Sequence, residues 1–281
     1  MSPLKSTTIY QALGGGKITE LQNKGLMTEL AHKIGFCVPQ SLTCNTDMID
    51  IDIPLPWIIK PLWSKNGKKS DIKRIYSYED WSKYRHEDHL REVQIQQLIE
   101  KEFEYQLIGL SLKGGQEVVI PGYSNVIRPA ETTNTGFLRY AKLENDFSDI
   151  VNISKKFLLA TGYSGLFSLE FLRGTDGRDY FMEINFRNDG NAICVTSAGV
   201  NLPYIWYLYN TGQDYDAYLK TVKLKTVYVM PEIEDLGQLW HKKVSVWKWI
   251  RDFVRTDSFM EFSRKDPKPF FHLLMRRLKI T

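Results

Sequence analysis

The chain has 281 residues, of which 43% are hydrophobic and 25% charged, a composition that excludes a disordered or fibrous protein. No run approaches the roughly 18 apolar residues that a membrane span requires, and no export signal is visible at the N-terminus. The cysteines lack metal-finger spacing and cannot all pair, so we expect a reducing cytoplasmic location for the protein; they are Cys37, Cys44 and Cys194.

The net charge of +4 is distributed unevenly along the chain. Residues 241–281 contain eleven Lys or Arg and four Asp or Glu, a net charge of +7, so the first 240 residues carry −3. This contrast marks the C-terminal segment as a separate compositional unit with its own role or packing partner.

The N-terminal part begins with residues 1–17, for which we expect an irregular segment. Gly14–Gly16 is interpreted as a flexible linker, because no strand precedes it and the first glycine of a phosphate-binding loop is missing. Residues 18–35 carry apolar side chains at helical spacing and predict a helix that ends before Pro39.

The next segments predict alternating strands and a helix. Residues 56–61 are expected to form a short buried strand, and the polar loop 64–70 leads from it to a second strand near 72–76. A helix is expected to begin at Tyr78, followed by a strand or hinge at 93–99.

The middle of the chain continues this mixture. Residues 102–110 alternate polar and apolar side chains, and a glycine pair turns this strand back into 117–120. A helix at 146–161 precedes a hairpin between residues 166 and 187. Because strands and helices follow one another in mixed hairpin order, the sequence predicts an α+β fold.

The hairpin carries the clearest chemical pattern. Asp176-Gly177 is typical of a two-residue turn between two apolar-rich strands. Pairing around such a turn places these residues opposite one another: Glu170 and Glu183, Ser168 and Asn185, and Leu166 and Arg187.

Alternation along the strands then separates the side chains into two faces. One face is expected to carry the apolar residues Phe167, Leu169, Phe171, Met182, Ile184 and Phe186. The other is expected to carry Ser168, Glu170, Glu183, Asn185 and Arg187, with Leu166, Leu172 and Phe181 at the margins.

The polar face brings two carboxylates side by side. Directly opposed like charges destabilise a strand pair, so Glu170 and Glu183 require a neutralising partner. With the amide oxygen of Asn185 they form a hard oxygen-donor set, of the kind that binds Mg²⁺ together with substrate phosphates. Arg187 on the same face is placed to hold a phosphate or a developing oxyanion. The alternative is a solvated hairpin face in which Arg187 and a lysine neutralise the acids.

The segment Glu183-Ile184-Asn185-Phe186-Arg187, preceded by Glu170-Phe171 and the Asp-Gly turn, resembles the metal-binding hairpin of the ATP-grasp ligases. This superfamily includes the carbamoyl-phosphate synthetase large subunit and D-aspartate ligase. The resemblance covers roughly residues 18–212. It implies an ATP-grasp fold of two α+β subdomains with the nucleotide between them, at 18–101 and 102–235, and a basic helical extension at 236–281.

The resemblance also implies which residues bind the nucleotide phosphates. Lys24 matches the basic residue that opens the first helix, and Lys60 matches a lysine at a strand end. The loop with Ser64 and Gly67 resembles the loop that covers the phosphates.

The adenosine part of the nucleotide is implied to bind at the following hinge. Gln96, Leu98 and Ile99 match the segment that presents backbone groups to adenine. Glu102 matches the acid that accepts hydrogen bonds from the ribose hydroxyls, and Glu104 is the alternative.

The implied reaction is amide formation by an ATP- and Mg-dependent carboxylate–amine ligase. The γ-phosphoryl group is transferred to a carboxylate, and the amine then attacks the acyl phosphate. Glu170, Glu183 and Asn185 are implied to hold magnesium, and Arg187 and Lys142 are implied to be catalytic.

The acceptor site is expected directly after the hairpin. Asn188, Asp189 and Asn191 either bind the amine substrate or cap a turn and the following helix.

The tail combines apolar side chains at helical spacing with basic charge. It resembles the C-terminal extension of ATP-grasp proteins of surface-polysaccharide synthesis, which implies attachment of an amino acid. Packing on the main domain is favoured over contact with a membrane surface, and nucleic acid is not expected, since no recognised module accompanies the charge.

Members of the family usually carry an N-terminal domain before the helix predicted at 18–35. Two hypotheses therefore stand. The first is a ligase acting on small carboxylate and amine substrates. The second is a nucleotide-binding subunit or scaffold without turnover, which needs a partner protein to supply the missing domain.

Overall fold

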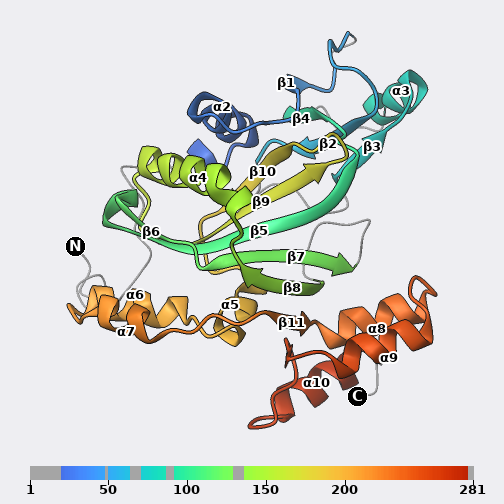
Figure 1. Ribbon diagram of the computed structural model, residues 1–281. Helices are drawn as coiled ribbons and strands as arrows, with labels where there is room; N and C mark the ends of the chain where they lie inside the picture. Colours follow the sequence, from blue (N-terminus) through green and yellow to red (C-terminus); the bar gives the residue numbers. More distant parts are fainter. Residues whose placement is uncertain (1–19, 48–49, 64–70, 87–91, 129–135, 278–281) are drawn as a thin grey trace.

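The computed structural model describes residues 20–47, 50–63, 71–86, 92–128 and 136–277. The described part of the chain contains a four-stranded and an eight-stranded sheet with helices packed around them (Figure 1). The irregular segment predicted at 1–17 and the loop residues Ser64 and Gly67 lie outside the described residues.

The smaller sheet is antiparallel, with the strand order β1-β4-β2-β3. Its elements, with the preceding helix, are α2 (Lys24–Ile34), β1 (Ser41–Asn45), β2 (Trp57–Pro61), β3 (Lys73–Ile75), α3 (Tyr78–His86) and β4 (Glu92–Gln97). Trp57 and Ile59 of β2 pack with Ile95 of β4 and Trp81 of α3 in a core of their own. The strands predicted at 56–61 and 72–76 and the helix start at Tyr78 are confirmed.

Helix α2 begins later than the predicted helix. The side chain of Asn23 accepts a hydrogen bond from the backbone N–H of Leu26 and so caps the helix at Lys24. The helix ends at Gly35, whose φ of 113° lies in the left-handed region that favours glycine. Lys24 therefore opens the helix, as the sequence resemblance implied.

The larger sheet has the order β10-β9-β5-β7-β8-β11-β12, with β6 paired to β5. Its strands are β5 (Lys101–Leu112), β6 (Glu117–Val119), β7 (Gly122–Arg128), β8 (Phe137–Lys142), β9 (Gly165–Gly174), β10 (Asp179–Asn185), β11 (Val227–Met230) and β12 (Ser258–Phe259). All of these pairs are antiparallel except β11 with β12.

Helices cover both faces of this sheet (Figure 1). Helix α4 (Ser148–Thr161) and α2 lie on one face, where Phe36 and Phe157 pack with Phe171 and Phe181. The opposite face carries a second core, built with the short helices α5 (Ile193–Ser197), α6 (Leu202–Asn210) and α7 (Tyr215–Thr221).

The hairpin of β9 and β10 has the predicted register at its polar end, but it reaches that register in a different way. Glu183 pairs with Glu170 and Asn185 with Ser168, as predicted. The turn, however, has three residues and not two, because the backbone N–H of Gly174 donates to the backbone oxygen of Arg178 at 2.8 Å across it. Gly177 supplies the left-handed conformation, with φ of 78°, that such a loop requires.

A β-bulge at Met182 compensates for the longer turn. Phe181 still pairs with Phe171, whereas the next pair is Glu183 with Glu170, so Met182 is the extra residue. Phe181 is consequently buried in the core, and Met182 lies beside Glu170 on the polar side; the prediction for these two side chains was wrong. Strand β10 ends at Asn185, so the predicted pairing of Arg187 with Leu166 is also wrong.

The C-terminal segment forms α8 (Glu232–Trp240), α9 (Val246–Val254) and α10 (Lys268–Arg277) and adds β12 to the edge of the large sheet. Its attachment includes a buried ion-pair cluster. The guanidinium of Arg128, on β7, donates to Asp235 of α8 at 2.7 Å and to Asp252 of α9 at 2.8 Å. The boundary predicted between the second subdomain and the tail, at residue 236, therefore falls inside α8.

No helix in the described ranges has both the length and the hydrophobicity to cross a membrane.

We predict that Arg128→Ala lowers the free energy of unfolding by about 3–5 kcal/mol, because it leaves two buried carboxylates without their cation. Chemical denaturation measures the change. Arg178→Ala is the matched control: its ion pair with Asp176 is exposed, so its loss should lower the free energy of unfolding far less. Equal effects of the two substitutions would contradict a stabilising role for the buried cluster.

Candidate functional site

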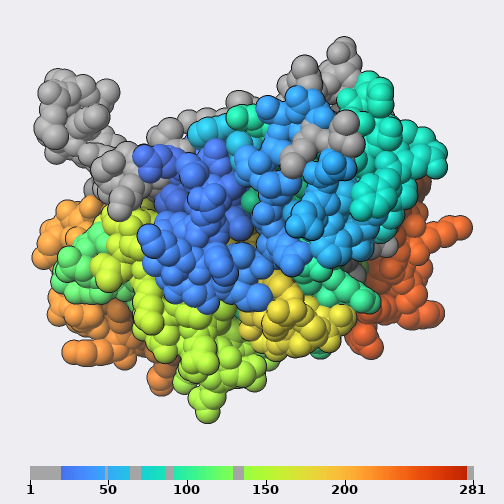
Figure 2. Space-filling model, turned by 90° about the horizontal axis from the view of Figure 1, so that it is seen from above, coloured from blue at the N-terminus to red at the C-terminus, as the bar shows by residue number. Residues whose placement is uncertain are grey.

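The polar face of the β9–β10 hairpin meets elements of the smaller sheet. Figure 2 shows residues of this sheet and of α2 (blue to cyan) against the hairpin (yellow). The Nζ atom of Lys24, in the first turn of α2, lies 3.2 Å from Oε2 of Glu183 on β10. The predicted phosphate-binding lysine and the predicted metal ligand are therefore in direct contact.

The two carboxylates of the hairpin have opposite electrostatic environments. Burial, followed by the charge of Glu183, raises the pKa of Glu170. Burial also acts to raise the pKa of Glu183, but Lys24 and Lys60 outweigh it and the pKa is lowered. The pair is therefore arranged so that Glu183 holds the negative charge more firmly than Glu170.

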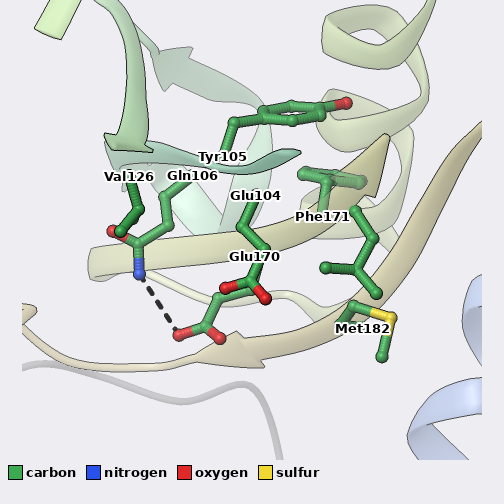
Figure 3. Close-up of a pocket in the computed structure, with 8 residues that line it drawn as sticks. Glu104, Tyr105, Gln106, Val126, Glu170, Phe171 and Met182 are labelled. Atoms are coloured by element: carbon green, nitrogen blue, oxygen red, sulfur yellow. Dashed lines mark hydrogen bonds between the residues drawn. The ribbon is translucent and has the colours of Figure 1, made fainter. Parts of the chain in front are cut away.

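Amide groups surround the Glu170 carboxylate. Its Oε1 atom accepts from Nδ2 of Asn185 at 2.9 Å and from Nε2 of Gln106 at 3.3 Å. Figure 3 shows the contact with Gln106, which reaches Glu170 from the neighbouring strand β5. The three side chains proposed to bind magnesium from sequence, Glu170, Glu183 and Asn185, thus lie together on one face.

The donor set fits a magnesium ion that also binds a phosphate. Within the described ranges no group of three or more His, Cys, Asp and Glu side chains is arranged to hold a metal. Two carboxylates and one amide oxygen are nevertheless the ligands that Mg²⁺ takes when substrate phosphates complete its coordination. The hairpin therefore suits Mg²⁺ bound with a nucleotide better than a metal held by protein ligands alone.

Lys60 is the second cation of the site. It is placed on β2, and its Nζ atom donates to Oε1 of Gln96 on β4 at 3.0 Å. Burial lowers the pKa of Lys60 to about 8, although the negative charge of Glu183 acts in the opposite direction. Lys60 is therefore a half-buried cation that is hydrogen-bonded to an amide oxygen and lies near a carboxylate.

A buried polar network under Glu170 was not identified from the sequence. Asn191 donates through Nδ2 to Oε1 of Gln106 at 2.8 Å, and Gln106 in turn donates to Glu170. Ser124 of β7 contacts the same oxygen of Gln106 at 3.4 Å. The alternation in 102–110 does place Gln106 on the polar face, but the partners come from segments far away in the sequence.

A second buried glutamine positions the start of α2. Nε2 of Gln94, on β4, donates to Oγ1 of Thr28 at 2.9 Å and to the backbone oxygen of Lys24 at 3.3 Å. The glutamine that alternates with Val93 and Ile95 in the strand or hinge predicted at 93–99 is the sequence signal for this contact.

The two candidates for ribose binding are placed differently. Glu102 is exposed and is the extra residue of a bulge between Lys101 and Phe103. Glu104 lines the small pocket with Gln106, Glu170 and Met182 (Figure 3). Burial raises the pKa of Glu104, against the effect of its hydrogen-bonded partner Lys101. The geometry therefore favours Glu104, the alternative that the sequence left open.

The predicted adenine hinge lies between β4 and β5. Gln96 is buried, bonded to Lys60 and, through Nε2, to Ser41 at 3.0 Å. The backbone N–H of Leu98 donates to Pro56 at 2.9 Å and is thus already used. Ile99 lies in the irregular connection just before β5, half-buried.

The residues after the hairpin are divided between surface and interior. Arg187 is exposed and donates to Oδ1 of Asn185 and to the backbone oxygen of Asn188, both at 3.4 Å. Asn188 is exposed as well. Asp189 caps the next turn by accepting from the N–H of Asn191 at 2.9 Å. Asp189 therefore has a capping role, and Asn191 is a buried hydrogen-bond donor to Gln106.

Lys142 is separate from this group of residues. It is exposed at the end of β8 and lines a second cavity, whose other walls are apolar: Val119, Pro121, Val200, Leu219, Val222 and Leu224. The structure brings Lys24, Lys60, Glu170, Glu183, Asn185 and Arg187 together, but Lys142 has no contact with this cluster among the described residues.

We predict that Glu170→Gln changes how stability depends on pH. A carboxyl group with a raised pKa in the folded state makes stability fall as pH rises from its unfolded value, near 4.5, through the folded value. Glu170→Gln mimics the protonated acid, so this loss of stability should be absent in the variant. The variant should therefore become more stable relative to the parent as pH rises over this range. Denaturation between pH 4 and pH 9 measures it.

The matched control for this prediction is Glu102→Gln, which removes an exposed carboxylate from the neighbouring strand. A difference for Glu170→Gln that changes no more with pH than the difference measured for this control would contradict the prediction.

No protein-family model matches the sequence, and the comparison with curated proteins finds no similar sequence. Solved structures are similar in fold. The N5-carboxyaminoimidazole synthetase of Staphylococcus aureus has 16% identity and a TM-score of 0.62, covering 79% of this chain and 59% of its own. The L-amino acid ligase of Bacillus licheniformis has 16% identity and a TM-score of 0.60, covering 75% and 53%.

A third similar structure contains ligands. The biotin carboxylase domain of the Hydrogenobacter thermophilus 2-oxoglutarate carboxylase, in complex with MgADP, ADP and bicarbonate, has 16% identity and a TM-score of 0.59, covering 75% of this chain and 50% of its own. The chain spans about half the length of these solved structures. The α+β architecture that the sequence predicted is confirmed, and the chain has the ATP-grasp fold.

Proposed function

We propose that the chain is an ATP- and Mg-dependent ligase that joins a carboxylate to an amine through an acyl phosphate. The observation that carries the proposal is the pair of opposed carboxylates on the β9–β10 hairpin, with Lys24 in contact with Glu183 and the charge of Lys60 stabilising the same carboxylate. Such a site gathers cations and metal-binding oxygens where a nucleoside triphosphate needs both. The MgADP of the H. thermophilus structure supports this choice.

The nucleotide would lie between the two sheets. Lys24 and Lys60 would offset the charge of its phosphates, and Glu104 would accept hydrogen bonds from the ribose. Gln96 holds Lys60, and the connection that contains Ile99 lies beside it at the start of β5. We also assign Ser64 and Gly67 to the phosphate-covering loop, and Leu98 to the wall of the adenine site.

Magnesium, when bound with the nucleotide, would neutralise phosphate charge and orient the γ-phosphoryl group for transfer. Glu183, Glu170 and Asn185 would hold it. Lys24 contacts Glu183 directly, so its Nζ atom can turn from the carboxylate to a phosphate oxygen without leaving the site. Gln106 keeps Glu170 in place by donating to Oε1.

The chemistry left to the protein is positioning and charge stabilisation. Arg187 is exposed at the edge of the carboxylate face, where its guanidinium can bind the oxygens of an acyl phosphate or of the tetrahedral species. Asn188, exposed beside it, would contact the amine substrate, whereas Asp189 and Asn191 would shape the loop. Lys142, the last residue of β8, would bind a substrate anion beside the apolar cavity that it lines.

We infer an amino acid as one of the two substrates. The similarity in fold to an L-amino acid ligase supports this class. The basic tail further suggests a role in surface-polysaccharide or cell-wall synthesis, where an amino acid is attached to a sugar carboxylate.

We predict that the purified protein releases ADP from MgATP when it is given the right pair from a panel of amino acids and uronic acids. Glu183→Gln should lower the rate at least about a hundredfold, because the metal loses a charged ligand. Lys33→Met, on the exposed side of α2, is the matched control and should leave the rate unchanged. Nucleotide binding without turnover for any pair would instead favour a nucleotide-binding subunit that requires a partner.

We predict that nucleotide affinity depends on the charge of Lys60. The pKa of Lys60, about 8, means that the side chain is charged below this pH and loses its proton above it. The dissociation constant of MgADP should therefore rise as pH increases beyond about 8. Lys60→Met should weaken binding about 10- to 100-fold at neutral pH and flatten this pH dependence. Isothermal titration calorimetry measures both, and an unchanged pH dependence in Lys60→Met would exclude Lys60 as the titrating group.

A further inference from the structure

Helix α9 exposes its apolar side chains to solvent. Trp247 is 81% exposed and Val254 78%, and Trp240, at the end of α8, is 85% exposed. Val246, Ile250 and Phe253 of α9 are exposed as well. Large apolar side chains scattered singly on a surface are ordinary, but a contiguous group marks an interaction site.

The exposed apolar residues of α9 lie on one side of the helix. At 3.6 residues per turn, the positions 246, 247, 250, 253 and 254 fall within an arc of about 120°. Asp252 points the other way, into the ion-pair cluster with Arg128. The polar contact thus holds α9 against the body of the protein with its apolar side turned outward.

Basic side chains lie on one flank of this apolar side. Arg251 is about 40° beyond one edge of the apolar arc, and the C-cap residue Arg255 and Lys248 lie about 80° and about 100° beyond the same edge; all three are exposed. Over residues 241–276 the exposed charged side chains number nine Lys or Arg and two Asp. Figure 1 shows that α8, α9 and α10 form a group at one end of the molecule, away from α2 and α4.

Aromatic and aliphatic side chains beside a basic border match the surface of an anionic lipid bilayer. Tryptophan favours the interface between headgroups and hydrocarbon, and each nearby Lys or Arg adds attraction to anionic lipids. We propose that the C-terminal helices bind the surface of an anionic membrane, with α9 lying in the plane of the interface.

The charge of the patch argues against the other occupants. A symmetric dimer through α9 would place the same basic border of both copies face to face, which opposes association. A nucleic acid would use the basic residues but would leave Val246, Ile250 and Val254 without an apolar partner. An anionic bilayer satisfies both the charged and the apolar parts.

Co-sedimentation of the purified full-length chain with vesicles tests the proposal. The partition coefficient should be at least about tenfold higher for phosphatidylcholine vesicles that contain phosphatidylglycerol than for phosphatidylcholine alone, and it should fall with added salt. The double variant Trp247→Ser with Val254→Ser should lower binding to the anionic vesicles about tenfold or more. The variant Lys248→Glu with Arg251→Glu should remove the preference for anionic lipid.

Tyr76→Ser is the matched control, since Tyr76 is 61% exposed but directly follows β3 of the smaller sheet. It should bind vesicles as the parent does. Thermal unfolding of each variant shows whether it is folded, and light scattering reports the oligomeric state. Absence of vesicle binding, binding that is equal for the Trp247→Ser, Val254→Ser variant, or a dimer that this variant dissociates would overturn the proposal. The assay contains no nucleotide, so its outcome is independent of the ligase proposal.

Discussion

Two acidic side chains that face each other across a strand pair repel, and the site is organised around this repulsion. Lys24 and Lys60 stabilise the negative charge of Glu183, whereas amide donors from Asn185 and Gln106 surround Glu170. Lys60 lies in the smaller sheet and both carboxylates in the larger one, while Lys24 belongs to α2, which packs between them. The attraction of Lys24 and Lys60 for Glu183 therefore makes the distance between the two sheets depend on the charge of the site. A bound nucleotide, which brings its own charge and metal, would replace these lysine–carboxylate contacts with contacts to phosphate and Mg²⁺.

The parts of the fold governed by local pattern could be predicted from sequence. The alternation of side chains in residues 166–187 placed Glu170 opposite Glu183, as observed, although the turn and the bulge at Met182 that produce this pairing differ from the prediction. Lys24 at the start of a helix and Lys60 in a short buried strand were implied by the resemblance to the ATP-grasp ligases. The structure brings these residues within reach of one another.

The parts set by contacts between distant segments could not be predicted. Whether the Asp-Gly segment closes a two- or a three-residue turn depends on Gly174 and Arg178, and the bulge at Met182 is compatible with the same sequence pattern. A second bulge moves Glu102 out of the site and leaves Glu104 in it. Asn191 lies 85 residues from its partner Gln106, so no periodicity relates them.

The ion-pair cluster of Arg128 has a mechanical consequence. Arg128 is the last residue of β7, and the same strand carries Ser124, which contacts Gln106 below Glu170. Helices α8 and α9 are held to that strand by the buried ion pairs of Asp235 and Asp252 with Arg128. Breaking either pair would leave a charge without its partner in the protein interior, which is costly. A displacement of α9 would therefore be transmitted along β7 to Ser124 and Gln106 beneath the carboxylate site. Fixing the C-terminal helices in place would likewise restrain β7 at Arg128.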